Sequence, residues 1–163
     1  MREIYLDNAA TTPMSPKVIN VITDEMKNDF GNASSTYELG RKARNVIDKA
    51  RHQIAESINA KDGEIIFTSG GSESNNTAIF GTAYSRKNSG KKIITTKIEH
   101  PSVLNPMKRL EQEGYNIVYL DVDETGHISL DQLKKELTPD TILVSTMAVN
   151  NEVGSIMPLK EIC

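Results

Sequence analysis

The sequence predicts an α/β protein with a mostly parallel sheet and flanking helices. Short runs of β-branched residues alternate with longer amphipathic stretches along the 163-residue chain, a spacing that is typical of βαβ crossovers. The hydrophobic fraction of 37% and the charged fraction of 25% are those of a globular protein with a hydrophobic core. The length suits one ordinary domain and makes two full domains an unfavourable interpretation.

Two helices are predicted before the first strand. The earlier one begins at Ser15 and Pro16, because serine is a good N-cap and proline is preferred at the first helical position. Its apolar residues recur at helical spacing, and we expect them to form a buried side: Val18, Ile19, Ile22 and Met26. The second helix is predicted over 38–59, where apolar residues at helical spacing form one stripe.

Four apolar runs follow and are predicted to be strands. They lie at 64–68, 92–96, 117–122 and 141–147. Helices over 73–86, from Pro101 onward and over 130–137 would connect them in turn, which places consecutive strands in parallel. Ligands of such open sheets bind beyond the carboxyl ends of the strands. The residues that follow each strand are therefore the candidate site residues.

The first predicted strand leads into Ser-Gly-Gly-Ser-Glu-Ser-Asn-Asn at 69–76. Gly70 and Gly71 permit close approach of a ligand to the backbone, and Ser72 is a natural N-cap. The helix that follows offers unpaired N–H groups and the positive end of its dipole. This pattern predicts an anion site, most naturally for phosphate, with a capped turn that binds nothing as the alternative. It is neither a Walker A loop nor a GxGxxG motif.

Polar side chains also follow two later strands. His100 stands before Pro101, at the rim of the predicted anion site, where an imidazole could stack on a flat cofactor or move a proton. The alternative is a helix-entry histidine that bonds only its own backbone. Asn150 and Asn151 follow the last strand, where two amides could fix a polar group of a ligand ring or simply form a turn.

Composition argues against several classes of protein. The 19 Lys and Arg residues face 22 Asp and Glu residues, whereas nucleic-acid binding needs a clustered basic surface. One Cys and three His give no metal-ligand spacing, and no GxSxG motif is present. The single Cys fits a reducing compartment. Without a long apolar run or a signal-peptide pattern, we expect no membrane association and a cytoplasmic location.

Five blocks of this sequence, in order, resemble the cysteine desulfurases of the NifS/IscS type. These enzymes are class V members of the fold-type I pyridoxal-phosphate superfamily. The blocks are residues 5–12, 31–35, 67–76, 99–103 and 149–154, so that the resemblance covers essentially the whole chain. It implies that residues 1–163 are the N-terminal segment plus an incomplete cofactor-binding large domain, and that the enzyme is a homodimer.

The resemblance implies roles for four residues. Gly71 and Ser72 match the pair that holds the phosphate of pyridoxal 5'-phosphate, with serine at 72 where threonine is usual. His100 matches the histidine that stacks on the pyridine ring and assists proton transfer. Asn151 matches the asparagine that contacts the phenolic oxygen of the ring.

The implied reaction converts L-cysteine to L-alanine and leaves the sulfur as a persulfide on an enzyme cysteine. The sulfur then passes to an acceptor or scaffold protein for iron–sulfur cluster assembly or thiolation pathways. The alternatives are another class V enzyme, such as a selenocysteine lyase or an aminotransferase, and a truncated non-catalytic module for dimerisation or scaffold binding.

The resemblance also places several catalytic groups beyond this chain. They are the lysine that forms the Schiff base, the aspartate at the pyridine nitrogen, the arginine for the substrate carboxylate and the sulfur-accepting cysteine. Cys163 is interpreted as an ordinary helix residue rather than as that cysteine. We therefore expect the 163 residues alone to be inactive, and a complementary polypeptide or a C-terminal part to cover the open sheet.

Overall fold

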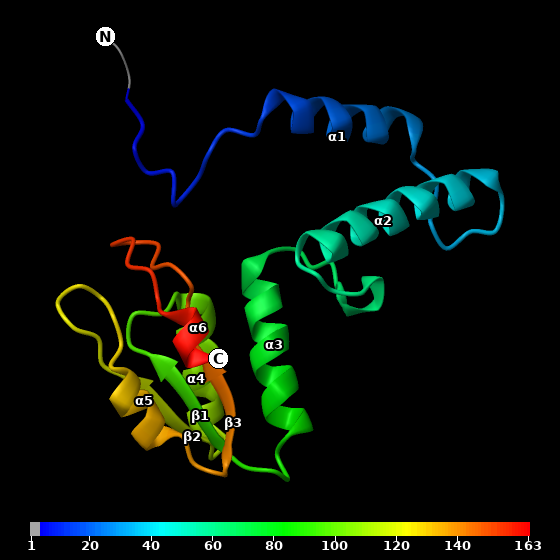
Figure 1. Cartoon of the computed structure of the whole chain (residues 1–163). Helices are drawn as coiled ribbons and strands as arrows, with labels where there is room; N and C mark the ends of the chain where they lie inside the picture. Colours follow the sequence, from blue (N-terminus) through cyan, green and yellow to red (C-terminus); the bar gives the residue numbers. More distant parts are fainter. Residues whose placement is uncertain (1–3) are drawn as a thin grey trace. The chain divides into compact units, whose positions relative to one another are not determined.

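A computed structural model describes residues 4–163 of the chain. The chain divides into two compact units, Met1–Phe67 and Thr68–Cys163. The N-terminal unit is helical, and the C-terminal unit contains a sheet with helices around it (Figure 1). All four residues to which the resemblance gives a role lie in the C-terminal unit.

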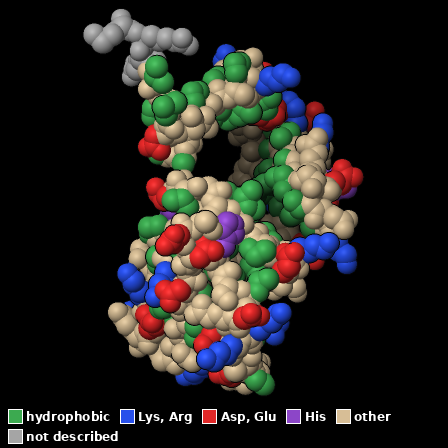
Figure 2. All heavy atoms as spheres, turned by 60° about the vertical axis from the view of Figure 1, so that its left-hand side comes forward, with side chains coloured by type: hydrophobic (Ala, Val, Ile, Leu, Met, Phe, Trp, Pro, Cys, Tyr) green, Lys and Arg blue, Asp and Glu red, His purple; other side chains and the backbone are tan. Residues whose placement is uncertain are grey.

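The N-terminal unit contains α1 (Pro16–Asn28), α2 (Glu38–Ser57) and the 3₁₀ turn η1 (Asp62–Glu64). The predicted start of α1 is confirmed, because the Ser15 hydroxyl accepts a hydrogen bond from the N–H of Val18 at 3.4 Å. The predicted burial of α1 is wrong: Val18, Ile19, Ile22 and Met26 are 46%, 47%, 41% and 69% exposed. An apolar stripe is buried only where another element packs on it, and within residues 4–163 no residue of α1 is buried. Figure 2 accordingly shows hydrophobic side chains on the surface of this unit.

The strand predicted at 64–68 is also wrong. Residues 65–68 form neither helix nor strand, and Ile66 is 74% exposed. The Arg51 guanidinium donates a hydrogen bond to the carbonyl of Ile65 and lies 4.9 Å from the centre of the Phe67 ring. β-branched residues favour extended backbone, but a strand also needs a neighbouring strand to pair with, and this segment has none among the residues described.

The C-terminal unit is built on three parallel strands, which confirms the predicted fold class. β1 (Lys92–Thr96), β2 (Asn116–Leu120) and β3 (Thr141–Ser145) lie in the order β2-β1-β3. In this register Ile94 of β1 pairs with Val118 and Val144. The bounds of β1 agree with the prediction, and those of β2 and β3 differ from it by at most two residues at either end. All five residues of the central strand are buried.

Four helices complete this unit: α3 (Gly71–Ser85), α4 (Pro101–Gln112), α5 (Leu130–Glu136) and α6 (Leu159–Ile162). Successive side chains of a strand point to opposite faces, so Ile93 belongs to a core cluster with α3 and α4. Ile94 belongs to a second cluster with residues of α5 and α6. No helix within the described chain is long and apolar enough to cross a membrane.

Candidate functional site

The turn before α3 differs from the prediction in one detail. Gly70, not Ser72, is the N-cap, and Ser72 is the second residue of the helix. The Glu73 carboxylate reaches back and accepts hydrogen bonds from the N–H and the hydroxyl of Ser69, both at 2.6 Å. These donors lower the pKa of Glu73. They also close the turn, so that the helix begins at Gly71 and the Ser72 hydroxyl is not used as a cap.

The start of α3 has the features of an anion site. The N–H groups of Gly71, Ser72 and Glu73 lie in the first turn, where the helix supplies no carbonyl partner. A Cβ placed at Gly70 or at Gly71 would meet no atom within 4 Å, so the space beside these N–H groups is open. A cavity of about 370 Å³ lies there. Open space over unpaired N–H groups at the positive end of a helix fits the phosphate of the implied cofactor.

His100 lines the same cavity as Gly71 and Ser72. It is the N-cap of α4, and its Nδ1 accepts a hydrogen bond from the N–H of Ser102 at 3.0 Å. The hydrogen bond to the backbone, which was the alternative interpretation of His100, is therefore present. It occupies only one of the two ring nitrogens. The imidazole is exposed, and its Nε2 has no hydrogen-bond partner among residues 4–163. One side of the ring thus serves the fold, and the other is available to a ligand.

The two asparagines after β3 have different surroundings. Asn150 is 5% exposed; its Oδ1 accepts from the N–H groups of Glu152 and Val153, both at 2.9 Å, and its Nδ2 donates to the carbonyl of Ile98 at 3.1 Å. Asn151 is exposed, and its amide bonds Glu152 at 2.8 Å. Asn150 therefore shapes the loop, and the Asn151 amide remains accessible.

The structure brings together three of the four predicted site residues. Gly71, Ser72 and His100 border one cavity, and Ser72 and His100 also border a groove of about 460 Å³ between α3 and α4. Asn151 borders neither, as far as the described residues show. Its proposed contact with the cofactor ring remains a prediction.

Glu99 is a residue next to the site that sequence reasoning did not single out. It is 6% exposed, and its Oε1 accepts from the Thr96 hydroxyl at 3.0 Å and from the N–H of Met147 at 2.8 Å. Burial raises the pKa of Glu99, and the two hydrogen bonds oppose this effect only in part. The sequence offered one signal: a carboxylate lies three residues after the end of a buried strand, where a charge needs partners.

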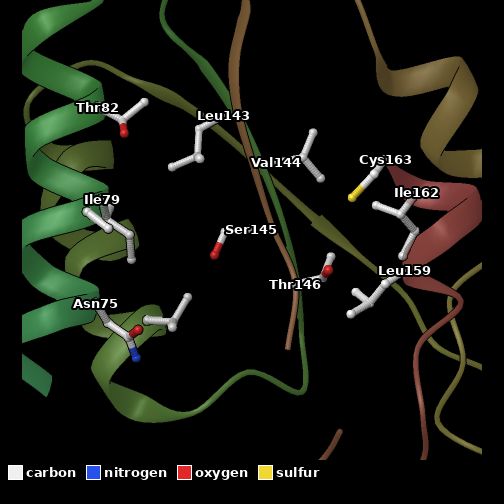
Figure 3. Close-up of a pocket in the computed structure, with 12 residues that line it drawn as sticks. Asn75, Ile79, Thr82, Leu143, Val144, Ser145, Thr146, Leu159, Ile162 and Cys163 are labelled. Carbon is white, nitrogen blue, oxygen red and sulfur yellow. The ribbon is translucent and has the colours of Figure 1, made fainter. Parts of the chain in front are cut away.

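A second cavity of about 610 Å³ lies between α3, β3 and α6 (Figure 3). Its walls are mainly apolar and include Ile79, Leu143 and Leu159. Cys163 lies at its border, exposed and one residue after α6. The described chain places no other ionisable side chain in this lining, and it holds no group of three or more His, Cys, Asp or Glu that could bind a metal. The cavity at Ser72 and His100 is therefore the candidate active site.

Comparison with known sequences places the chain in a family. The family Aminotransferase class-V matches residues 4–163. The putative cysteine desulfurase IscS 1 of Bacillus subtilis (strain 168) is 51% identical, over 99% of this chain and 43% of that protein. The cysteine desulfurase IscS of Dictyoglomus turgidum (strain DSM 6724 / Z-1310) is also 51% identical, over 99% of this chain and 41% of that protein. The chain thus spans less than half the length of these curated relatives.

Solved structures show the same relationship. A NifS-like protein superposes with a TM-score of 0.96 at 37% identity, over 99% of this chain and 44% of its own. A structure described as SspA in complex with cysteine gives a TM-score of 0.91 at 39% identity, over 97% of this chain and 46% of its own. The parallel sheet and its helices are therefore those of a NifS-like, fold-type I pyridoxal-phosphate enzyme. Sequence, fold and relatives agree that this chain belongs to the class-V aminotransferase family.

Proposed function

We propose that this chain is the N-terminal part of a pyridoxal-phosphate-dependent cysteine desulfurase, which converts L-cysteine to L-alanine. The observation that carries the proposal is the cavity in which the N-terminus of α3, with Gly71 and Ser72, lies beside His100. The relatives named as cysteine desulfurases support the reaction, and the neighbour solved with cysteine supports the substrate.

The residues of the cavity fit the cofactor in separate roles. The Ser72 hydroxyl and the N–H groups at the start of α3 would hold the phosphate, and the exposed ring of His100 would stack on the pyridine. Asn151, which does not border this cavity but has an accessible amide, would bind the phenolic oxygen. Pyridoxal phosphate supplies an electron sink for the reaction. His100 contributes a ring nitrogen, Nε2, that can hold or move a proton beside it.

The rest of the reaction is proposed by analogy with the family. The lysine that anchors the cofactor and the cysteine that receives the sulfur would come from sequence outside these 163 residues. The sulfur would pass to an acceptor or scaffold protein for iron–sulfur cluster assembly or thiolation, and the enzyme would be a homodimer. Cys163, at the border of the apolar cavity, is not assigned the role of sulfur acceptor.

Titration with a cofactor analogue tests the phosphate site directly. The ¹⁵N-labelled chain is titrated with pyridoxine 5'-phosphate, which has no aldehyde to react with lysines, and separately with pyridoxine. We expect the N–H signals of Gly71, Ser72 and Glu73 to shift with the phosphorylated compound alone. Equal shifts with both compounds, or no shift with either, would contradict the proposed phosphate site.

Replacement of Ser72 measures the contribution of its hydroxyl. S72A removes a charge-assisted hydrogen bond worth about 1.5–3 kcal/mol, so the dissociation constant of pyridoxine 5'-phosphate should rise roughly tenfold to a hundredfold. S85A is the matched control, because the Ser85 hydroxyl lies at the far end of α3 and bonds only the carbonyl of Thr82. Equal affinity in S72A and S85A would exclude Ser72 as a phosphate ligand.

A further inference from the structure

Ser102, in the first turn of α4, is held by two asparagines of α3. The Nδ2 of Asn75 donates a hydrogen bond to the Ser102 hydroxyl oxygen at 2.9 Å. The Nδ2 of Asn76 donates to the Ser102 carbonyl at 3.4 Å and to the Ser72 carbonyl at 2.7 Å. The Ser102 carbonyl lacks its usual helical donor, because the residue four positions later is Pro106, which has no N–H. α3 therefore fixes both polar ends of Ser102.

Ser102 in turn contacts the imidazole of His100. Its N–H lies 3.0 Å and its hydroxyl oxygen 2.8 Å from Nδ1 of the ring. A backbone N–H can only donate, so Nδ1 is the acceptor in this pair. The amide NH₂ of Asn75 likewise can only donate, so the Ser102 oxygen accepts from Asn75 and directs its own hydrogen to Nδ1. The three side chains form a relay with one direction, from Asn75 through Ser102 to His100.

We propose that Asn75 and Ser102 are positioning residues that hold the neutral His100 ring with its proton on Nε2. The bond made by one ring nitrogen decides which nitrogen carries the proton. With Nδ1 accepting from Ser102, Nε2 is the nitrogen that exchanges protons with a ligand in the cavity lined by Gly71 and Ser72. The identity of that ligand rests on the proposed function, whereas the direction of the relay rests on the hydrogen bonds alone.

Nitrogen NMR of the histidine side chains tests the relay without any cofactor. The full chain contains three histidines, and the signals of His100 are identified by their loss in H100Q. We expect the parent protein, at a pH where the ring is neutral, to show Nδ1 without a proton and Nε2 with one. A parent spectrum with the proton on Nδ1 would overturn the proposal. Because this measurement is made on the parent protein, it does not depend on the folding of any variant.

N75D replaces the amide donor at the start of the relay with a carboxylate, which can only accept hydrogen bonds. The carboxylate introduced by this substitution would accept the hydrogen of the Ser102 hydroxyl, whose lone pairs would then face Nδ1. We expect the Nδ1 signal to shift, because this nitrogen loses the hydroxyl donor, while the N–H of Ser102 still keeps the proton on Nε2. Q112E is the matched control: it adds the same charge at the far end of α4, from an exposed residue that makes no side-chain hydrogen bond to any described residue, and it should leave the ring signals unchanged.

A double variant separates the relay from a general effect of charge. In N75D/S102A the hydroxyl that transmits the change is absent, so the Nδ1 signal should lie where S102A alone places it. An equal shift with and without the Ser102 hydroxyl would overturn the relay, as would an unchanged spectrum in a folded N75D. Because pyridoxine 5'-phosphate is not used, failure of the relay and failure of the proposed phosphate site are read separately.

Discussion

Glu99 joins the end of the central strand to the segment after its neighbour. Its carboxylate accepts one hydrogen bond from Thr96, the last residue of β1, and one from the N–H of Met147, two residues after β3. These bonds hold the two strand ends together directly before His100. A buried carboxylate with only two donors is incompletely compensated, which is why its pKa is raised.

The raised pKa of Glu99 predicts how the stability of the C-terminal unit depends on pH. In the native protein the pKa lies above the ordinary value of 4.5, so the native state binds the proton more tightly than the unfolded state. The contribution of Glu99 to the free energy of unfolding is therefore complete below the ordinary pKa and declines as the pH rises through the native pKa. E99Q cannot ionise, and its amide oxygen can still accept both hydrogen bonds.

Urea unfolding at a series of pH values measures this effect. We expect E99Q to lose less stability than the parent between acidic and neutral pH. E124Q serves as the control. Glu124 is exposed, so its substitution should leave the dependence of the unfolding free energy on pH the same as in the parent. If the unfolding free energy of E99Q fell with pH as steeply as that of the parent, Glu99 would not titrate in this range.

At the scale of residues, the sequence predicts the position of a site residue better at the start of a helix than in an irregular loop. Gly71 and Ser72 follow from the rule that a helix N-terminus attracts anions, and His100 follows from its place after a strand. The surroundings of Asn151 depend on the turn at 151–153 that the buried Asn150 organises, and the sequence of this turn has no regular pattern. The Asn75–Ser102–His100 relay could not be predicted from the sequence, because Asn75 and Ser102 are far apart in the chain and meet only where α3 packs against α4.

α4 is the element that links the hydrophobic core to the candidate site. Its N-cap is His100, and Met107 and Leu110 on its inner face are fully buried against the sheet and α3. Proline at its first position fits the helix start. The second proline, Pro106, costs one helical hydrogen bond, and Asn76 of α3 provides a replacement donor.

Truncation of Leu110 tests how far the core supports this helix. L110A should lower the free energy of unfolding of the C-terminal unit by about 2–5 kcal/mol, because it removes a fully buried side chain and leaves a cavity. K108A, an exposed change on the same helix, should alter it by no more than about 0.5 kcal/mol. Urea unfolding followed by circular dichroism measures both. A similar small effect in the two variants would mean that α4 is not anchored through Leu110.

Elements with a partner in the chain were predicted best. The run at 92–96 forms β1 with the expected bounds, since it pairs on both sides. The run at 64–68 has a similar composition but no partner strand among the described residues, and its Ile66 remains exposed. Periodicity describes the face that an element can bury, and only tertiary packing decides whether that face is buried.

On the scale of the whole chain, burial is distributed unevenly between the two units. The two core clusters both lie in Thr68–Cys163. In the N-terminal unit the buried residues of α2 are Gly40, Ala43 and Ala55, which contribute little apolar area. Since the free energy of local opening follows buried contacts, the two units should differ in the protection of their backbone amides.

Hydrogen exchange followed by mass spectrometry measures this difference in the full chain. Peptides from β1 should exchange slowest, because the strand is buried along its length and paired on both sides. Peptides from α1 should exchange faster than those from α2, α3 and α4, because each of these three helices has buried residues and α1 has none within residues 4–163. Protection of α1 equal to that of β1 would contradict this expectation, and dilution would then identify the cause. Protection that falls on dilution would come from a second copy covering the apolar stripe of α1, whereas protection independent of concentration would come from packing within the chain.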